Sequence, residues 1–496
     1  MVDNSLIESL RKMNLDLTSA FLLANPFFRL SKPNHENLVK YKRYGIKSTK
    51  FRLTYNLLQF PLFAFLQGAF NILLSFSTYR EWVSKQSFSG KSFDYLGISQ
   101  VTSSNQEFKA DPLLGEIPLK VAMGQTLCMF YLNGTRIPRA VAQKSLSTEQ
   151  FQTNIVNSKT LSPIGTIQVF FENLSACGAI FSLLLQRNKW TSEERLLLSE
   201  GLLYQLKRPT FANLFLMRRI NEILDSVKIG TIFFTLEGHA HEAALITLIK
   251  NQHPLIKIRA IQHAPLVPSQ FGYFDNLNML RSTDAILCSG EVTYQLTIEY
   301  LKSQNAACMN VRVIGSSKNH TKEILDRNSF KEAVGKVLLL PEGTENSAVE
   351  FLQLLRQLSL SSPNVNFLLR LHPATRQSPK VARHLGVILP KNASISEGTL
   401  MGDLEASICC IYRGSAAAIE GLAFGVIPIH YNSNLQFDLD PIVYERLNHP
   451  RCTNYEQLEM LMKNLTKAGA LHSAESSDFV DFFQDYYAPL KIEALS

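Results

Sequence analysis

Short apolar runs that alternate with helical stretches are the feature of this sequence that most constrains its fold. They form two series, one between residues 93 and 315 and the other between residues 337 and 431. The predicted strands are 93–99, 125–132, 166–171, 231–236, 256–262, 285–289 and 311–315, followed by 337–341, 366–371, 406–412 and 426–431. Strands of this length separated by helices are typical of doubly wound parallel sheets. The sequence therefore predicts an α/β protein with two facing Rossmann-like domains that join near residues 315–335.

Length and composition agree with several packed domains. At roughly 100–200 residues per domain, 496 residues favour two or three. The expected division is a helical, membrane-associating extension (1–89), a first Rossmann-like domain (90–320) and a second one (321–496) that ends in an aromatic helix at 479–490. With 46% hydrophobic and 19% charged residues, intrinsic disorder is excluded. A net charge of +8 favours anionic partners, but nucleic acid is not expected, because there is no zinc-finger spacing, RNP-like motif or dense basic helix.

The N-terminal extension combines a basic run with an uncharged stretch. Six cations lie between residues 40 and 52 with no acid among them, and residues 53–79 carry no charge. Residues 57–76 are long enough to cross a bilayer, although Pro61 and three amide side chains interrupt them. Three interpretations remain open: a buried helical hairpin, an anchor in the plane of an anionic membrane through residues 40–79, and a true span.

The cysteines and the N-terminus indicate a cytoplasmic protein, peripheral on the inner membrane if the basic run binds lipid. The seven cysteines are scattered through apolar segments and form no CxxC pair, which favours buried reduced thiols over zinc or disulfides. The first residues carry acids where a signal peptide would begin with a basic segment.

Polar residues that follow the strands are the candidates for chemistry, because open parallel sheets bind ligands at the carboxyl ends of their strands. In the first domain Glu237 follows the strand 231–236, and His239 and His241 open the next helix. Glu237 could act as a general base, or it could bind free N–H groups at the helix start. His263 follows the next strand and is either catalytic or structural. A metal site is not expected here, because the HExxH spacing is absent.

The second domain carries three strand-end motifs that together indicate a nucleotide. They contain Glu342 and Gly343, then Arg370, His372 and Pro373, and finally Arg413, Gly414, Ser415 and Glu420. Glycine permits close backbone approach, His and Arg could neutralise a phosphate, and a Gly-Ser helix start offers N–H groups. The last acid could accept hydrogen bonds from a ribose. Neither GxxxxGK[ST] nor GxGxxG occurs, so a P-loop and a dinucleotide site are excluded. The pair Asp438 and Asp440 resembles a metal-binding DxD but is interpreted as incidental.

With these motifs, residues 90–440 resemble the bacterial GT-B glycosyltransferases of surface-polysaccharide synthesis (capsule and lipopolysaccharide), especially enzymes that use CMP-activated acidic sugars such as Kdo or sialic and other nonulosonic acids. That group has an acidic-acidic-Gly motif, a His-Pro motif that binds CMP and a later Ser motif that binds phosphate. Here Leu236-Glu237-Gly238 departs in its first position, His372-Pro373 matches, and Arg413-Gly-Ser415 with Glu420 takes the third place.

The resemblance implies transfer of an acidic sugar from a CMP-sugar, with Glu237 as base and no metal or other cofactor. The acceptor would be a glycan or a lipid-linked glycan. Three alternatives remain open: a CDP-polyol phosphotransferase of similar layout, a nucleotide-sugar epimerase or hydrolase, and a non-catalytic subunit of a polysaccharide-assembly complex.

Overall fold

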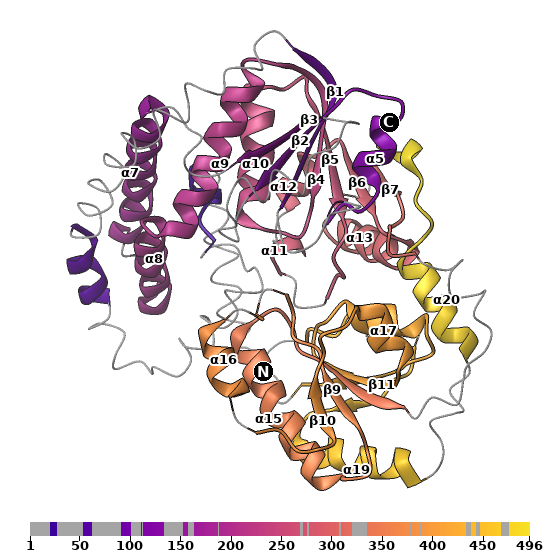
Figure 1. Ribbon diagram of the computed structural model, residues 1–496. Coiled ribbons are helices and arrows are strands. Elements are labelled where there is room, and N and C mark those ends of the chain that lie inside the picture. The colour runs from indigo at the N-terminus through magenta and orange to yellow at the C-terminus, as the bar shows by residue number, and fades with distance from the viewer. Residues whose placement is uncertain are drawn as a thin grey trace.

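The computed structural model shows two α/β domains, one above the other in Figure 1, joined by the segment after residue 313 and by the C-terminal helix. The residues described are 20–26, 53–61, 91–100, 111, 113–132, 152–156, 163–186, 188–267, 271–274, 277–306, 309–319, 335–373, 375–376, 378–386, 388–432, 438–442, 447–467 and 476–496. The prediction of an α/β fold with two Rossmann-like domains, the arrangement expected for a GT-B enzyme, is confirmed.

The first domain is built on a seven-stranded, entirely parallel sheet in the order β3-β2-β1-β4-β5-β6-β7. Its strands are β1 (Ser92–Gln100), β2 (Leu127–Leu132), β3 (Gln152–Val156), β4 (Lys228–Thr235), β5 (Lys257–Gln262), β6 (Ala285–Cys288) and β7 (Val311–Val313). The sequence predicted all of them except β3. The strand order reverses between β1 and β4, which pair in register from Ser92 with Lys228 to Ile98 with Phe234. A crevice for ligands is expected beyond the carboxyl ends at this switch point.

Helices cover this sheet, and one of them contains residues that the sequence predicted as a strand. They are α5 (Ile117–Ala122), α7 (Pro163–Leu185), α8 (Ser192–Gln205), α9 (Arg208–Leu224), α10 (Ala240–Gln252), α11 (Phe271–Phe274), α12 (Leu277–Arg281) and α13 (Glu291–Ser303). Residues 166–171 were predicted as a strand but lie inside α7. Thr166, Ile167 and Val169 favour a strand locally, but the largely apolar segment continues for 23 residues from Pro163, a length that favours a helix.

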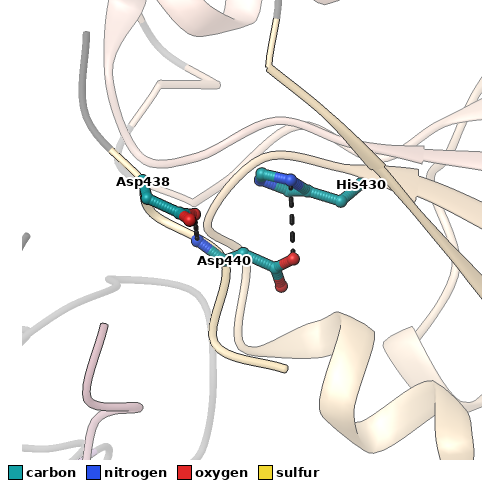
Figure 2. A group of neighbouring side chains, drawn as sticks. All are labelled: His430, Asp438 and Asp440. Carbon is teal, nitrogen blue, oxygen red and sulfur yellow. Dashed lines mark hydrogen bonds and ion pairs between the residues drawn. The ribbon is translucent and has the colours of Figure 1, made fainter. Parts of the chain in front are cut away.

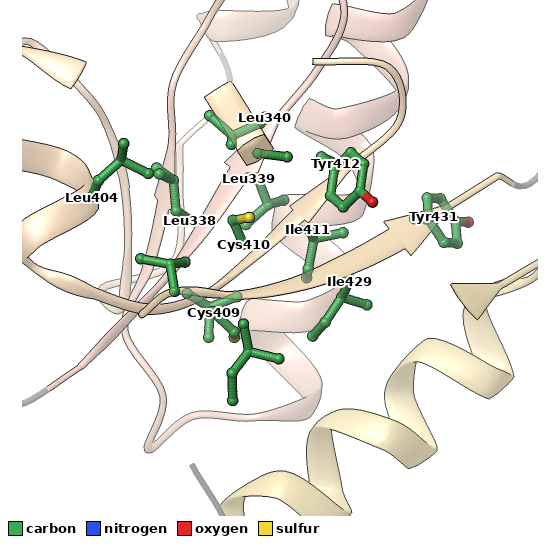
Figure 3. Close-up of a cluster of buried hydrophobic side chains, with 14 of the residues drawn as sticks. Leu338, Leu339, Leu340, Leu404, Cys409, Cys410, Ile411, Tyr412, Ile429 and Tyr431 are labelled. Atoms are coloured by element: carbon green, nitrogen blue, oxygen red, sulfur yellow. The ribbon is translucent and has the colours of Figure 1, made fainter. Parts of the chain in front are cut away.

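The second domain contains a six-stranded parallel sheet in the order β10-β9-β8-β11-β12-β13, which is the 3-2-1-4-5-6 order of a Rossmann fold. The strands are β8 (Lys336–Leu340), β9 (Phe367–Leu369), β10 (Ala393–Ile395), β11 (Ser407–Tyr412), β12 (Ile427–Tyr431) and β13 (Arg451–Cys452). The sequence analysis missed the short strands β10 and β13. Figure 3 shows the core between the central strands, where Leu339, Cys410 and Ile411 are fully buried.

The helices of the second domain are α15 (Glu345–Ser361), α16 (Pro379–Leu385), α17 (Leu400–Glu405), α18 (Ala417–Leu422) and α19 (Tyr455–Lys467). Thr344 caps α15 by accepting the N–H of Ser347. The six cysteines of the described part are free and buried, as predicted; Cys308 lies outside it. Burial raises the pKa of the Cys409 thiol to about 12, which makes it a poor nucleophile.

The C-terminal residues connect the two domains. Helix α20 (Ser476–Tyr486) contacts α13 of the first domain and α18 of the second, and it lies at the side of both domains in Figure 1. The chain then runs along the first domain, where Ala488 N–H donates to Ser289 O at 2.9 Å and Lys491 N–H to Ile314 O at 2.7 Å. At its end, Arg259 Nη2 donates to Ser496 O at 2.7 Å. We call residues 476–496 the C-terminal strap.

The N-terminal extension is described only in part. Ala20–Leu23 forms the short helix α2, and residues 53–61 form a helix whose Asn56 is buried and donates to Glu200 Oε1 at 2.9 Å. The basic run 40–52 and most of the stretch 57–76 lie outside the described residues, so the three interpretations of this region stay open. One helix of the described part, Ile164–Leu185 of α7, is long and apolar enough to span a bilayer, and a third of its most apolar window is buried.

Gly315 should be essential for attachment of the strap. Its φ of +86° lies in the left-handed region, and a Cβ atom there would collide with the carbonyl oxygen of Pro489. Gly315→Ala should lower the free energy of unfolding by at least about 2 kcal/mol, because left-handed backbone alone costs about 1–2 kcal/mol. Urea unfolding measures the change. Gly124→Ala, where a Cβ would meet nothing within 4 Å, should change stability little, and equal effects of both substitutions would contradict the prediction.

Candidate functional site

Glu237 lies directly after β4, and a second acid fixes its position. Glu242 on α10 is fully buried, and its Oε2 accepts the N–H groups of Glu237 at 2.9 Å, Gly238 at 2.8 Å and His239 at 2.8 Å. Gly238 has a φ of +83°, so the turn requires glycine. Burial raises the pKa of Glu242 to about 7, against the N–H donors that favour the carboxylate. Glu242 therefore occupies the free N–H groups of the turn, and the Glu237 side chain is left to face other groups.

Two histidines lie against Glu237. His263 Nε2 is 3.1 Å from Glu237 Oε1, and His239 Nε2 is 3.4 Å from Glu237 Oε2. Burial lowers the pKa of His263, which favours the neutral imidazole; its Nδ1 is buried and has no hydrogen-bond partner among the described residues. His241 stacks on His239 with ring centroids 5.5 Å apart, and burial lowers the pKa of His241 to about 3. A half-buried carboxylate with imidazoles beside it can accept a proton from a hydroxyl group.

Lys318 connects this cluster with the second domain. It follows β7, its ammonium pairs with Glu420 Oε1 of α18 at 2.9 Å, and it lies over the ring of Tyr487. It is also close enough to His263 to contribute to the lowering of the pKa of that imidazole, after the larger effect of burial. The segment after β7 of the first sheet and helix α18 of the second domain therefore meet at the ion pair between Lys318 and Glu420.

In the second domain His372 and Pro373 are exposed after β9, beside the turn after β8. A Cβ atom on Gly343 would lie 3.0 Å from His372 Nδ1, so the imidazole packs directly against this glycine. The carbonyl of His372 accepts the N–H of Thr375 at 2.9 Å, which closes the loop below it. The structure thus brings Gly343, His372 and Pro373 together at the carboxyl edge of the sheet.

Two predicted phosphate ligands are instead engaged in ion pairs within the domain. Arg370 Nη1 lies 2.6 Å from Asp403 Oδ2 and donates to Gly398 O at 2.9 Å. Arg413 is buried between Glu342 Oε1 at 2.9 Å and Glu350 Oε2 at 2.6 Å. A buried guanidinium already paired with carboxylates is a costly group to withdraw. We therefore omit Arg370, Arg413 and Glu342 from the proposed nucleotide contacts.

The turn after β11 depends on a loop from further along the chain. Gly414 has a φ of +132°, and a Cβ there would lie 3.1 Å from Leu439 Cβ. Ser415 is half-buried and precedes α18, which has only six residues, and Ser415 does not cap it. The expected dipole of this helix is correspondingly small.

The loop that covers Gly414 is fixed by the carboxylate of Asp440, which is fully buried. Tyr412 OH donates to Asp440 Oδ1 at 2.7 Å, and His449 Nε2 lies 2.9 Å from Asp440 Oδ2. Figure 2 shows that His430, Asp438 and Asp440 also point toward one another. Among the described residues these three form the group that could hold a metal ion, with ligand atoms within 4.8 Å. Arg451, however, pairs with Asp438 at 2.8 Å and with Asp440 at 3.4 Å, and so supplies the positive charge.

Of the predicted site residues, the structure groups Glu237, His239, His241 and His263 in one domain and Gly343, His372 and Pro373 in the other. Glu420, expected near a ribose, is paired with Lys318. The sequence analysis missed Lys318 and Glu242. Applying the strand-end rule to the last strand of the first series would have included Lys318, whereas Glu242 lies within the following helix, which that rule does not cover.

Known proteins resemble this chain in shape and only weakly in sequence. The chain matches no protein-family model and no curated protein. Among solved structures, it is similar to the UDP-GlcNAc 2-epimerase from Neisseria meningitidis bound to UDP-GlcNAc (11% identity, 81% of this chain, 97% of that one, TM-score 0.47). It is also similar to the α,α-trehalose 6-phosphate synthase from Burkholderia multivorans (12% identity, 82% of this chain, 96% of that one, TM-score 0.46). A third similar structure is the glycosyltransferase of kitacinnamycin (12% identity, 80% of this chain, 95% of that one, TM-score 0.41). Likeness at this level describes shape and assigns no activity.

Acidification should destabilise the protein partly through His430. Burial lowers the pKa of His430 from 6.5 to about 4, so between these values the unfolded chain binds a proton that the folded protein does not. Stability then falls as the pH drops below 6.5, and His430 should account for about 2 kcal/mol of the loss between pH 7 and pH 5. Urea unfolding at both pH values of the wild type and of His430→Asn measures this share.

The free energy of unfolding of His430→Asn should differ less between pH 7 and pH 5 than that of the wild type. His372→Asn, at an exposed histidine in the same domain, should keep the wild-type difference. An unchanged difference in His430→Asn would contradict the assignment.

Proposed function

We propose that this protein is a glycosyltransferase that transfers an acidic sugar from a CMP-sugar to a hydroxyl group of a glycan or lipid-linked glycan at the cytoplasmic face of the membrane. The observation that carries the proposal is the position of Glu237. It follows β4 at the switch point of the first sheet, is half-buried, and has both carboxylate oxygens beside imidazoles. Glu242 holds the turn, so the carboxylate is positioned before a substrate arrives.

The donor would bind at the carboxyl edge of the second sheet. His372 is exposed there, Gly343 leaves room for the imidazole, and Ser415 offers a hydroxyl on the neighbouring turn. Lys318 lies between this edge and the Glu237 cluster, so a phosphate between the two domains would meet its ammonium. A lysine and a histidine can stabilise the charge that develops on a departing phosphate.

In the proposed reaction the acceptor oxygen attacks the anomeric carbon, and its proton passes to Glu237. The bond between that carbon and the phosphate oxygen breaks, and CMP leaves with the bonding electrons. His263 lies on one oxygen of Glu237, so it orients the carboxylate and can take part in removal of the proton. The choice of cytidine rests on the resemblance of His372-Pro373 and the Ser415 motif to CMP-sugar transferases.

Glu237→Gln should reduce turnover at least about a hundredfold and leave donor affinity nearly unchanged, because the amide keeps the shape but cannot accept the proton. Initial rates with a CMP-sugar and a glycan acceptor, together with calorimetry of CMP binding, separate the two effects. Glu116→Gln, at the exposed acid that precedes α5, is the matched control and should behave as the wild type. Retained turnover in Glu237→Gln would remove Glu237 from the role of base.

The nucleotide should be CMP in preference to CDP, UDP and GDP, and His372→Ala should weaken its binding about tenfold, which corresponds to one hydrogen bond to a charged group. Calorimetry with the full-length protein measures both. His384→Ala, on α16 of the same domain, should not change the affinity.

The outcome also distinguishes the alternatives. A preference for CDP would indicate a polyol-phosphate transferase, and one for UDP a hexose transferase or an epimerase. Absence of nucleotide binding would leave a non-catalytic subunit as the better interpretation.

A further inference from the structure

The outer face of α7 is apolar and exposed along the whole helix. Ile164, Ile167, Phe171, Phe181 and Leu185 are between 40% and 69% exposed, and their spacing of three, four, ten and four residues places them on one side of the helix. The helix 53–61 adds Tyr55 and Leu58, which are 51% and 74% exposed. Seven of the twelve large hydrophobic side chains exposed in the described part of the chain therefore belong to these two helices.

The two helices are parts of one surface. Leu53, Leu57 and Phe60 pack against the cluster that contains Ile180 and Leu184 of α7. Figure 1 shows α7 and α8 at the outer side of the first domain, beyond α9 and α10 and on the side opposite α13 and α20. We call the exposed side chains of α7 and of helix 53–61 the outer face.

The inner side of α7 belongs to the protein. Asn173 is buried and donates to Gln205 O at 3.1 Å, and Gln205 Nε2 donates back to Asn173 Oδ1 at 2.7 Å. Cys177 and Ile180 are buried against α8. A helix attached in this way to its own domain cannot cross a bilayer alone. The exposed apolar side chains on its outer side nevertheless need an apolar neighbour.

Charge identifies that neighbour. Glu172 is the one charged residue between Ile164 and Leu185, and it lies 3.9 Å from Arg218 of α9, so the outer face itself has no unbalanced acid. The basic run at residues 40–52 is joined directly to Leu53, the first residue of helix 53–61. In an isologous dimer through the outer face, two such runs of six cations would meet and repel. On an anionic bilayer the same cations face phosphate groups.

We propose that the outer face of α7 and helix 53–61 lies in the plane of an anionic bilayer, with its apolar side chains at the boundary between headgroups and acyl chains. In this position the helix axis is parallel to the membrane. The proposal does not depend on the reaction catalysed, and it places the first domain, whose Glu237 cluster would receive the acceptor, next to the membrane.

The test is co-sedimentation of the full-length protein with vesicles of phosphatidylglycerol and phosphatidylethanolamine. Phe171→Glu combined with Phe181→Glu should lower the fraction bound at least tenfold, because two charges enter the apolar boundary. The matched control is Leu255→Glu combined with Ile388→Glu, at exposed apolar residues elsewhere (94% and 93%), and it should bind as the wild type. Vesicles of phosphatidylcholine should bind the wild type much more weakly. Equal binding of the Phe171/Phe181 variant and the wild type to anionic vesicles would overturn the proposal.

Hydrogen exchange of the wild type gives a second test that needs no variant. Peptides from α7 should gain protection when anionic vesicles are added, while peptides from α15 should not change. If vesicles that bind the protein leave the exchange of the α7 peptides unchanged, the proposal fails. The proposal also fails if light scattering shows that the wild type is a dimer and the Phe171/Phe181 variant a monomer, while both bind vesicles equally.

Discussion

Parallel pairing of the strands is the constraint on which the rest of this structure depends. Because every strand in both sheets points the same way as its neighbours, all of the loops that follow strands gather at one edge of each sheet. The turns that contain Glu237 and His263 belong to one such edge, and those that contain His372 and Ser415 belong to the other. Lys318 and Glu420 join the two edges by an ion pair, so residues far apart in sequence come to share one site.

The relative position of the two edges depends on the C-terminal strap. Helix α20 contacts a helix of each domain, and Tyr486 OH also accepts the N–H of Leu266 at 3.0 Å, close to the His263 loop. Gly290 and Gly315 allow the backbone of residues 485–489 to approach the first domain as closely as it does. A donor bound to the second domain would therefore be presented to Glu237 through contacts made more than two hundred residues away in the sequence. The strap thus has a role in the site although none of its side chains is proposed to touch substrate.

The sequence was sufficient for the fold because the strands are short, apolar and separated by helices, and this pattern is local. It failed at 166–171, where β-branched and aromatic residues gather inside a longer helix, and at β10 and β13, which have only three and two residues. The strand-end rule also found Glu237, His263 and His372. It could not show which charged groups would neutralise each other: the pairing of Arg370 with Asp403 and of Arg413 with Glu342 and Glu350 depends on the tertiary structure. Glu242 was not singled out, because only the folded turn shows that three N–H groups converge on it.

This distribution of charge pairs bears on how a nucleotide could be bound at all. Ion pairs within the second domain engage the half-buried Arg370 and the buried Arg413, while Asp440 and Arg451 offset one another behind the Gly414 turn. Among the described residues proposed to meet the donor, the groups that can carry a positive charge are then Lys318, paired with Glu420, and the exposed His372. A site with few fixed charges binds free phosphate weakly. Its affinity for a nucleotide-sugar then depends also on contacts with the base, the ribose and the sugar. Binding energy that comes from the whole donor can be used to orient its anomeric carbon toward Glu237, and this is the requirement for transfer to an acceptor.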